Sequence, residues 1–233
     1  MKRPNASGCG AAGRAVITLL ALSLLSNCED PVELKPAPEA PPGSPEAVVT
    51  ALAKAYQQRD PELFRSVLAN EHGANADYLF FLSEPTNVGE TQWDYAEEAR
   101  IHQRMFRPDK PAPGDPVVPS DLWLQSIQIT LTPLEVFKVR EDLYSANEGK
   151  DGKLDPHRWR ATDARYSTYV YFDLANTDYK VEGESNFVVI EDLAKQVGQA
   201  GKFLLFVWED LGSGFPGISQ SSSSWGSFKG LYR

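Results

Sequence analysis

His102 is the residue in this sequence best placed for acid–base chemistry. It falls in a segment, residues 93–106, whose apolar side chains recur at helical spacing, and Glu98 precedes it by one helical turn. An imidazole oriented by a carboxylate can act as a general base in a pocket. The alternative is a partly buried ring at the helix edge that is hydrogen-bonded to a neighbour. We expect the packing role, and we assign no catalytic residue.

The remaining histidines do not predict a metal site. His72 and His157 fall in expected loops, and no two histidines have the i, i+4 or His-x-His spacing of a zinc site. The sequence also has no Gly-rich phosphate loop and no nucleophile motif of the Gly-x-Ser-x-Gly type. We therefore expect neither a metal nor a cofactor.

Residues 147–155 partly match a calcium-binding loop. Asp151 and Gly152 stand at loop positions 5 and 6, but Gly149 and Arg158 stand at positions 3 and 12, where oxygen ligands are required. An Asp-Gly pair also favours a type I′ turn. A hairpin tip explains this segment better than a calcium site.

Aromatic residues provide the second candidate signal for a pocket. Aromatic side chains on a concave sheet could bind a small apolar ligand, but strands also use them for ordinary packing. We expect packing to account for most of them. The pocket candidates are His102, Trp93, Tyr95, Tyr169, Tyr171, Phe206 and Trp208.

Composition excludes several classes of protein. The 233 residues include 23 Lys and Arg against 32 Asp and Glu, a net charge of −9, which disfavours general nucleic-acid binding. A hydrophobic content of 42% excludes a disordered chain. Two cysteines exclude a disulfide-rich scaffold and a four-cysteine zinc site.

The N-terminus has the pattern of a secretory signal. Lys2, Arg3 and Arg14 precede an apolar run over residues 15–25. As a helix this run spans about 16 Å, half of the ~30 Å that a membrane span needs. A positive segment followed by a short apolar run is typical of an export signal.

The apolar run ends in Leu25-Ser26-Asn27-Cys28, which resembles a bacterial lipoprotein box. The resemblance implies cleavage between Asn27 and Cys28 and acylation of Cys28 with fatty acids such as palmitate. Asn27 stands where such boxes usually have Gly, Ala or Ser. The alternative is an ordinary secretory signal with an incidental cysteine. As a lipoprotein, the chain would be anchored to a membrane of the bacterial cell envelope, with its folded part outside the cytoplasm, for example in the periplasm.

The chain divides into three parts. The signal covers residues 1–27, a Pro-rich tether covers 28–43, and a single folded domain covers 44–233. A polyproline-type tether of this length reaches up to about 45 Å, and it would hold the domain away from the membrane.

The order of the elements predicts an α+β domain. Ser44 and Asp60 are expected to cap helices that begin at Pro45 and Pro61, and Thr91–Asp94 matches a capping box before the helix that ends near Phe106. Strands are expected over residues 78–82, 127–131, 136–140, 165–174, 186–190 and 202–208. Helices followed by strands indicate N-terminal helices packed on one face of an antiparallel sheet.

Three segments resemble the nuclear transport factor 2-like superfamily, which includes ketosteroid isomerases and polyketide cyclases. They are residues 44–56, 60–64 and 206–210. The resemblance implies that residues 44–233 form helices on a strongly curved antiparallel sheet, cone-like with a single pocket. It also implies that a homodimer is common. Inserts near residues 107–119 and 145–163 depart from compact members, and none of the enzymes' acid–base residues can be carried over.

These observations leave three functions open. The leading hypothesis is a lipid-anchored, non-enzymatic module that binds a small apolar ligand or a partner protein. The second is a pocket enzyme of the isomerase, cyclase or hydrolase type that uses His102 or a carboxylate. The third is a structural subunit that dimerises through the exposed face of its sheet.

Overall fold

The computed structural model describes residues 43–70, 77–82, 91–140, 159–192, 203–212 and 225–233, which belong to one compact unit. The predicted signal, the acylated Cys28 and the tether up to residue 42 lie outside the described residues. So do His72, His157, the segment 147–155 and most of the insert at 145–163.

Two capped helices open the domain, as predicted. Helix α1 (Pro45–Gln58) begins where the Ser44 side chain accepts a hydrogen bond from the backbone of Ala47. Helix α2 (Pro61–Val67) begins where Asp60 accepts from two backbone amides. Arg59 joins the helices with a left-handed backbone (φ 52°), and its N–H closes the last turn of α1. Side-chain caps satisfy amides that have no partner within the helix, so each helix begins at a defined residue.

The third helix begins later than predicted. Helix α4 (Tyr95–Phe106) is capped by Asp94, whose carboxylate accepts from the Glu97 amide at 2.9 Å. The prediction that Thr91 is the cap was therefore wrong. Residues Gln92–Asp94 form strand β2 instead, because Trp93 is buried and stacks on Phe80. Burial of that ring keeps the backbone extended up to the true cap.

In the described part of the chain, seven strands form one sheet. Their order is β2, β1 (Leu79–Phe81), β7 (Phe203–Gly212), β6 (Asp178–Asp192), β5 (Trp159–Leu174) and β3 (Leu124–Pro133), and β4 (Lys138–Val139) also pairs with β5. All neighbours are antiparallel except β1 and β7, so the sheet is mixed rather than purely antiparallel. Strand β1 follows helix α2 and is far from β7 in the chain, so no hairpin forces these two strands to be antiparallel.

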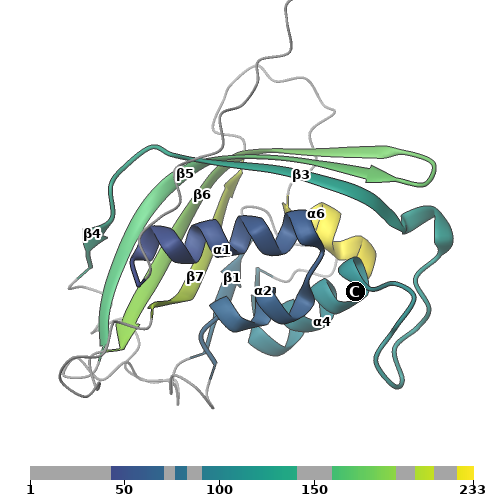
Figure 1. The fold of residues 1–233 in the computed structure, drawn as a ribbon, viewed down its shortest axis with the longest axis horizontal. Coiled ribbons are helices and arrows are strands. Elements are labelled where there is room, and N and C mark those ends of the chain that lie inside the picture. Colours follow the sequence, from purple (N-terminus) through teal and green to yellow (C-terminus); the bar gives the residue numbers. More distant parts are fainter. Residues whose placement is uncertain (1–42, 71–76, 83–90, 141–158, 193–202, 213–224) are drawn as a thin grey trace, which may run out of the picture. The chain divides into compact units, whose positions relative to one another are not determined.

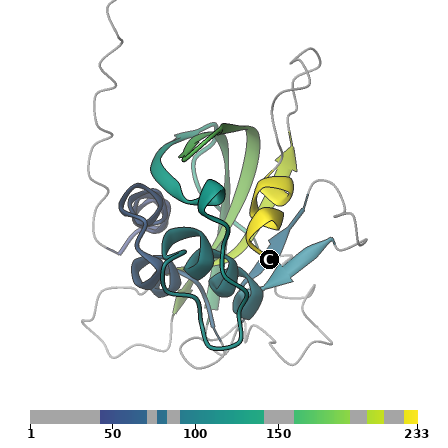
Figure 2. The same ribbon diagram turned by 90° about the vertical axis from the view of Figure 1, so that its right-hand side faces the viewer.

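The helices lie on one side of a strongly curved sheet (Figures 1 and 2). Helix α1 contacts β3, β6 and β7, and α4 packs on α2. A 3₁₀ turn, η1 (Ser120–Leu122), precedes β3, while helix α6 (Trp225–Lys229) and the turn η2 (Gly230–Tyr232) end the chain against β6, β7 and α4. The prediction of an α+β fold with N-terminal helices on a curved sheet is confirmed.

Side chains of β5 alternate between the two faces of the sheet. Tyr166, Val170 and Phe172 are buried on the helix side, where they join the main core, and Arg165 and Tyr169 are exposed on the outer face. A smaller apolar cluster, which includes Phe206 and Val207, is separate from the main core. Within the described ranges, no helix has the length and hydropathy required to cross a membrane.

Candidate functional site

His102 is enclosed in the main core. Its ring has no exposed surface and stacks on Phe64 with 3.6 Å between ring centroids. The Nδ1 atom lies 2.8 Å from the Glu98 carbonyl oxygen, and because a carbonyl only accepts, Nδ1 carries the proton. The Nε2 atom then accepts from the Tyr56 hydroxyl at 2.5 Å. Burial, and to a lesser extent the Lys229 charge, holds the pKa of His102 well below its usual value.

The Glu98 carboxylate is committed to a different partner. Its Oε1 is 3.8 Å from Nδ1 of His102, but it forms an ion pair with Lys229, and both side chains are fully buried. Burial raises the pKa of Glu98 and lowers the pKa of Lys229, and their pairing opposes both shifts. The imidazole is therefore oriented by the Glu98 backbone carbonyl, and the carboxylate–imidazole pair of the catalytic alternative does not form a hydrogen bond.

Lys229 was not predicted as a functional or structural residue. Its Nζ lies 3.6 Å from the Phe80 ring centroid, 4.4 Å from Trp208 and 5.1 Å from Trp225. It is separated from Glu98 by 131 residues in the chain, so no local spacing links the pair. The available signal was a lysine among the aromatic residues of the last nine positions.

Aromatic side chains occupy the space between the helices and the sheet. Trp225 lies 4.9 Å from Trp208, and Phe228 stacks on Phe172 at 3.7 Å, all measured between ring centroids. The Trp208 indole also donates to Ser185 at 3.0 Å. The resemblance implied a single pocket between the helices and the sheet, and the Trp225 and Phe228 rings of the C-terminal helix lie in that space.

The seven pocket candidates do not converge. His102, Trp93 and Trp208 are buried in the main core, and Tyr95 is half-buried at the start of α4. Two outer-face positions of β5 carry Tyr169 and Tyr171, because their even-numbered neighbours fill the inner face. Phe206 belongs to the smaller cluster, since a bulge between Val188 and Val189 shifts the register of β7. The structure thus distributes the seven candidates between the main core, the smaller cluster and the outer face.

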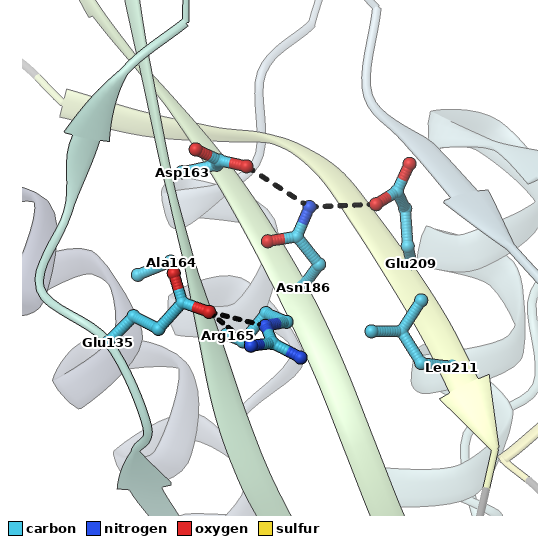
Figure 3. A pocket seen from close by; sticks show the side chains of 7 residues that line it. All are labelled: Glu135, Asp163, Ala164, Arg165, Asn186, Glu209 and Leu211. Carbon is cyan, nitrogen blue, oxygen red and sulfur yellow. Dashed lines mark hydrogen bonds and ion pairs between the residues drawn. The ribbon is translucent and has the colours of Figure 1, made fainter. Parts of the chain in front are cut away.

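A pocket of about 250 Å³ lies on the outer face of the sheet (Figure 3). Strands β5, β6 and β7 and the segment between β3 and β4 supply its walls. Pairing of the strands places Arg165, Asn186 and Glu209 opposite one another in one row. Its lining residues are Glu135, Asp163, Ala164, Arg165, Asn186, Glu209 and Leu211.

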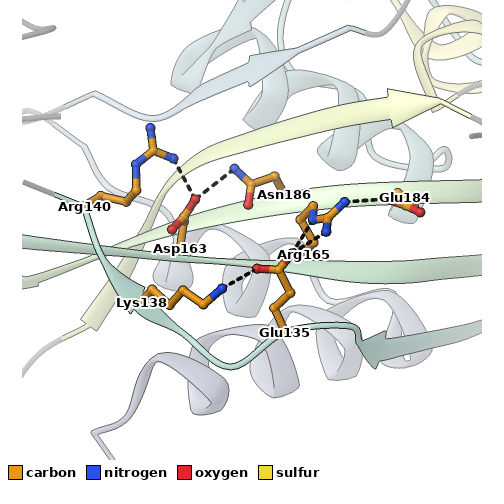
Figure 4. A network of polar contacts seen from close by, with 7 residues as sticks. All are labelled: Glu135, Lys138, Arg140, Asp163, Arg165, Glu184 and Asn186. Carbon is orange, nitrogen blue, oxygen red and sulfur yellow. Dashed lines mark hydrogen bonds and ion pairs between the residues drawn. The ribbon is translucent and has the colours of Figure 1, made fainter. Parts of the chain in front are cut away.

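Ion pairs surround this outer-face pocket (Figure 4). Arg165 donates to Glu135 at 2.6 Å and to Glu184 at 3.5 Å, and Lys138 donates to Glu135 at 2.9 Å. These two cations lower the pKa of Glu135, which keeps that carboxylate ionised. On the same edge of the sheet, Arg140 donates to Asp163 at 2.7 Å.

Asn186 and Glu209 retain hydrogen-bonding capacity. The Asn186 amide nitrogen donates to Glu209 at 2.7 Å and to Asp163 at 3.5 Å. Its Oδ1 is buried and has no hydrogen-bond partner among the described residues, and the residue as a whole is only 6% exposed. Among the described residues, Glu209 is held by this neutral amide and by no cation. The centre of the pocket thus offers an unused acceptor beside an uncompensated carboxylate.

Sequence reasoning missed this pocket. Its lining residues are spread from Glu135 to Leu211, and each charged member alone resembles an ordinary solvated strand residue. The described residues contain no group of three or more His, Cys, Asp or Glu side chains arranged to hold a metal ion.

Comparisons with known proteins give only distant likenesses. A scan against protein-family models found no match, and neither did a search of curated proteins. Among solved structures, a putative aromatic ring hydroxylase from Novosphingobium aromaticivorans is similar at 11% identity and a TM-score of 0.39, over 70% of this chain and 82% of that one. A putative dehydratase of the NTF2-like family from Streptomyces avermitilis is similar at 11% identity and a TM-score of 0.37, over 70% and 89%.

Proposed function

We propose that this protein is a lipid-anchored, non-enzymatic module of the bacterial cell envelope that binds a partner protein through the outer-face pocket. The observation that carries the proposal is the location of the open site. The described pocket lies on the outer face, whereas His102 is fully buried with both ring nitrogens hydrogen-bonded. A general base must reach its substrate, so the buried His102 favours binding over catalysis.

The size of the pocket favours a partner protein over a free small ligand. Pockets for drug-sized molecules usually enclose about 300–1,000 Å³, and this one encloses about 250 Å³ in an open surface. That space suits one side chain of a larger partner. The exposed Leu211 lines the pocket, and the exposed Leu134 and Val136 flank the lining residue Glu135 in the chain, so these apolar side chains could contact the rest of such a partner.

A homodimer through the same face is the second candidate. Paired charges occupy part of the outer face, including Arg165 with Glu184 and Lys180 with Glu182. Stable homodimer interfaces are more apolar than the remaining surface. The charged rows therefore favour a different protein as the partner.

The anchor in this proposal rests on the sequence. The lipoprotein box ending at Cys28 and the Pro-rich tether would hold the domain at a membrane. Two or three acyl chains anchor stably, because each buried CH₂ contributes about 0.8 kcal/mol. Attachment would keep the outer-face pocket near partners in the same envelope.

Site-specific photo-crosslinking in intact cells tests the proposal. A photoreactive amino acid replaces Val136, which is 76% exposed beside the pocket, and in a matched control it replaces Gln128, an exposed residue further along β3. We expect an adduct of one defined mass at position 136 and none at 128. An adduct with twice the chain's own mass would support the homodimer, and equal or absent labelling at both positions would refute a binding role for this face.

A further inference from the structure

We infer that the outer-face pocket takes the guanidinium group of an arginine side chain that the partner protein presents between apolar residues. This inference rests on the proposed function and adds the chemistry of the partner. The pocket is lined by three carboxylates, Glu135, Asp163 and Glu209, and by one cation, Arg165. Charge complementarity therefore favours a cationic group as the occupant.

The buried amide of Asn186 indicates a missing hydrogen-bond donor. Figure 3 shows its amide nitrogen directed to Asp163 and Glu209, with the oxygen turned away from both, on the side of Ala164 and Arg165. Buried polar atoms are almost always hydrogen-bonded, and an exception in a native structure requires an explanation. A donor from a bound guanidinium would satisfy this oxygen.

Glu209 is the carboxylate available to such a cation. Glu135 is already held by Lys138 and Arg165, and Asp163 is held by Arg140. The positive charge of Arg165 is compensated in turn by Glu135 and Glu184. Within the described ranges, Glu209 is bound only by the neutral amide of Asn186, so its charge remains to attract a ligand.

The layout of the acceptors favours a guanidinium over an ammonium group. Asn186 and Glu209 are direct neighbours on β6 and β7, so one ligand must reach acceptors on two strands. A guanidinium presents five donors in a planar fork and binds carboxylates with two parallel hydrogen bonds, whereas an ammonium is a compact point charge. The exposed Leu134 and Val136 adjoin Glu135 on one wall of the pocket, and Leu211 lies on the opposite wall, which suits apolar residues on either side of the arginine.

Calorimetric titration of the full chain in a non-ionic detergent tests this assignment. The probe is the capped peptide acetyl-Leu-Arg-Leu-amide, and its controls carry lysine or citrulline in place of arginine. Citrulline keeps the shape of arginine but has no charge. We expect the arginine peptide to bind at least tenfold more tightly than either control, with an affinity that falls as salt is added.

Two isosteric variants locate the binding site. Glu209→Gln removes the charge but can still accept from Asn186, so the fold should be retained, and we expect it to weaken the arginine peptide at least tenfold. Glu182→Gln removes one charge from the same face, away from the pocket lining, and should change the affinity less than twofold. Equal losses in both variants would show general electrostatic attraction and overturn the assignment, as would equal binding of the lysine or citrulline peptide.

The two proposals can fail separately. If no arginine peptide binds while the photo-crosslink at position 136 persists, the guanidinium assignment is refuted and the binding function stands. If both are absent, the outer-face pocket is not a binding site, and the proposed function fails with it.

Discussion

A histidine that could have been a catalytic base is fixed as a neutral structural residue. The Glu98 carbonyl fixes the proton on Nδ1, and the Tyr56 hydroxyl donates to Nε2, so each nitrogen has the partner that suits the neutral ring. Protonation would add a proton to Nε2, which in the neutral ring accepts the hydrogen bond from Tyr56. It would also place a positive charge in a fully buried site. Because the pKa of His102 is lower in the folded chain than in the unfolded chain, the free energy of unfolding depends on pH.

Acidification should destabilise the wild-type chain more than the His102→Gln variant. Below pH 6.5 the unfolded chain binds a proton at this histidine, whereas the folded chain excludes it because the pKa of His102 is depressed. The free energy of unfolding therefore falls as pH falls through this range. Relative to the variant, the wild type should lose about 2 kcal/mol between pH 7 and pH 5. Urea unfolding of both proteins at several pH values measures the difference, and parallel curves would contradict the assignment.

Removing one partner of the Glu98–Lys229 pair should destabilise the protein more than replacing both partners with apolar residues. Lys229→Met leaves a buried carboxylate without its cation, which typically costs about 3–5 kcal/mol. The double variant Glu98→Leu with Lys229→Met removes both charges and should regain a large part of that loss. Unfolding free energies of the single and double variants form a thermodynamic cycle. Additive losses would mean that the two side chains do not interact in the folded protein.

At the scale of elements, the C-terminal helix α6 contributes buried side chains to the main core. Five residues are too few to form a stable helix alone, so tertiary contacts must hold it. Trp225 packs edge-on against Tyr56 and Trp208, and Phe228 stacks on Phe172. These rings join the N-terminal helices to the sheet.

Trp225→Ala should reveal the contribution of this helix. Removing a fully buried indole from such a cluster typically costs about 3–5 kcal/mol. The matched control, Leu231→Ala, truncates a partly exposed residue six positions later and should cost well under half as much. Thermal and urea unfolding compare the two. Similar losses would indicate that the C-terminal segment unfolds independently of the core.

Local signals account for what the sequence predicted about these elements. Ser44 and Asp60 mark the helix starts because capping depends on neighbouring residues only. The cap of the third helix was predicted at Thr91 instead of Asp94, because burial of Trp93 against Phe80 is a tertiary effect that local sequence does not show. Helix α6 gave no periodic signal, since its length is too short for a pattern.

The outer-face pocket could not be predicted for a different reason. It depends on the register that aligns Arg165, Asn186 and Glu209 across three strands. Strand pairing over such distances in the chain leaves no spacing motif in the sequence. The orientation of Tyr169 and Tyr171 likewise depends on which face of β5 is buried, and that became clear only with Tyr166 and Phe172 in the core.

On the scale of the whole molecule, the proposed binding and the proposed attachment would use separate parts of the chain. The pocket residues fall between Glu135 and Leu211, and the predicted acylation site is Cys28. A module of this kind gains effective concentration from its tether, because the anchored domain meets partners within a short radius. Detachment should then weaken partner binding in the cell without changing the pocket itself.

Cys28→Ser should release the protein from membranes. Serine cannot form the thioether that carries the lipid, so labelling with a radioactive or clickable fatty acid should disappear and the chain should move to the soluble fraction. The net negative charge of the chain offers no attraction to anionic headgroups, so attachment depends on the lipid.

Asn27→Ala, which restores the residue type usual before the cysteine, should retain labelling. The purified Cys28→Ser chain should bind the arginine peptide as tightly as the wild type. Continued membrane attachment of Cys28→Ser, with no lipid label on the wild type, would refute the anchor.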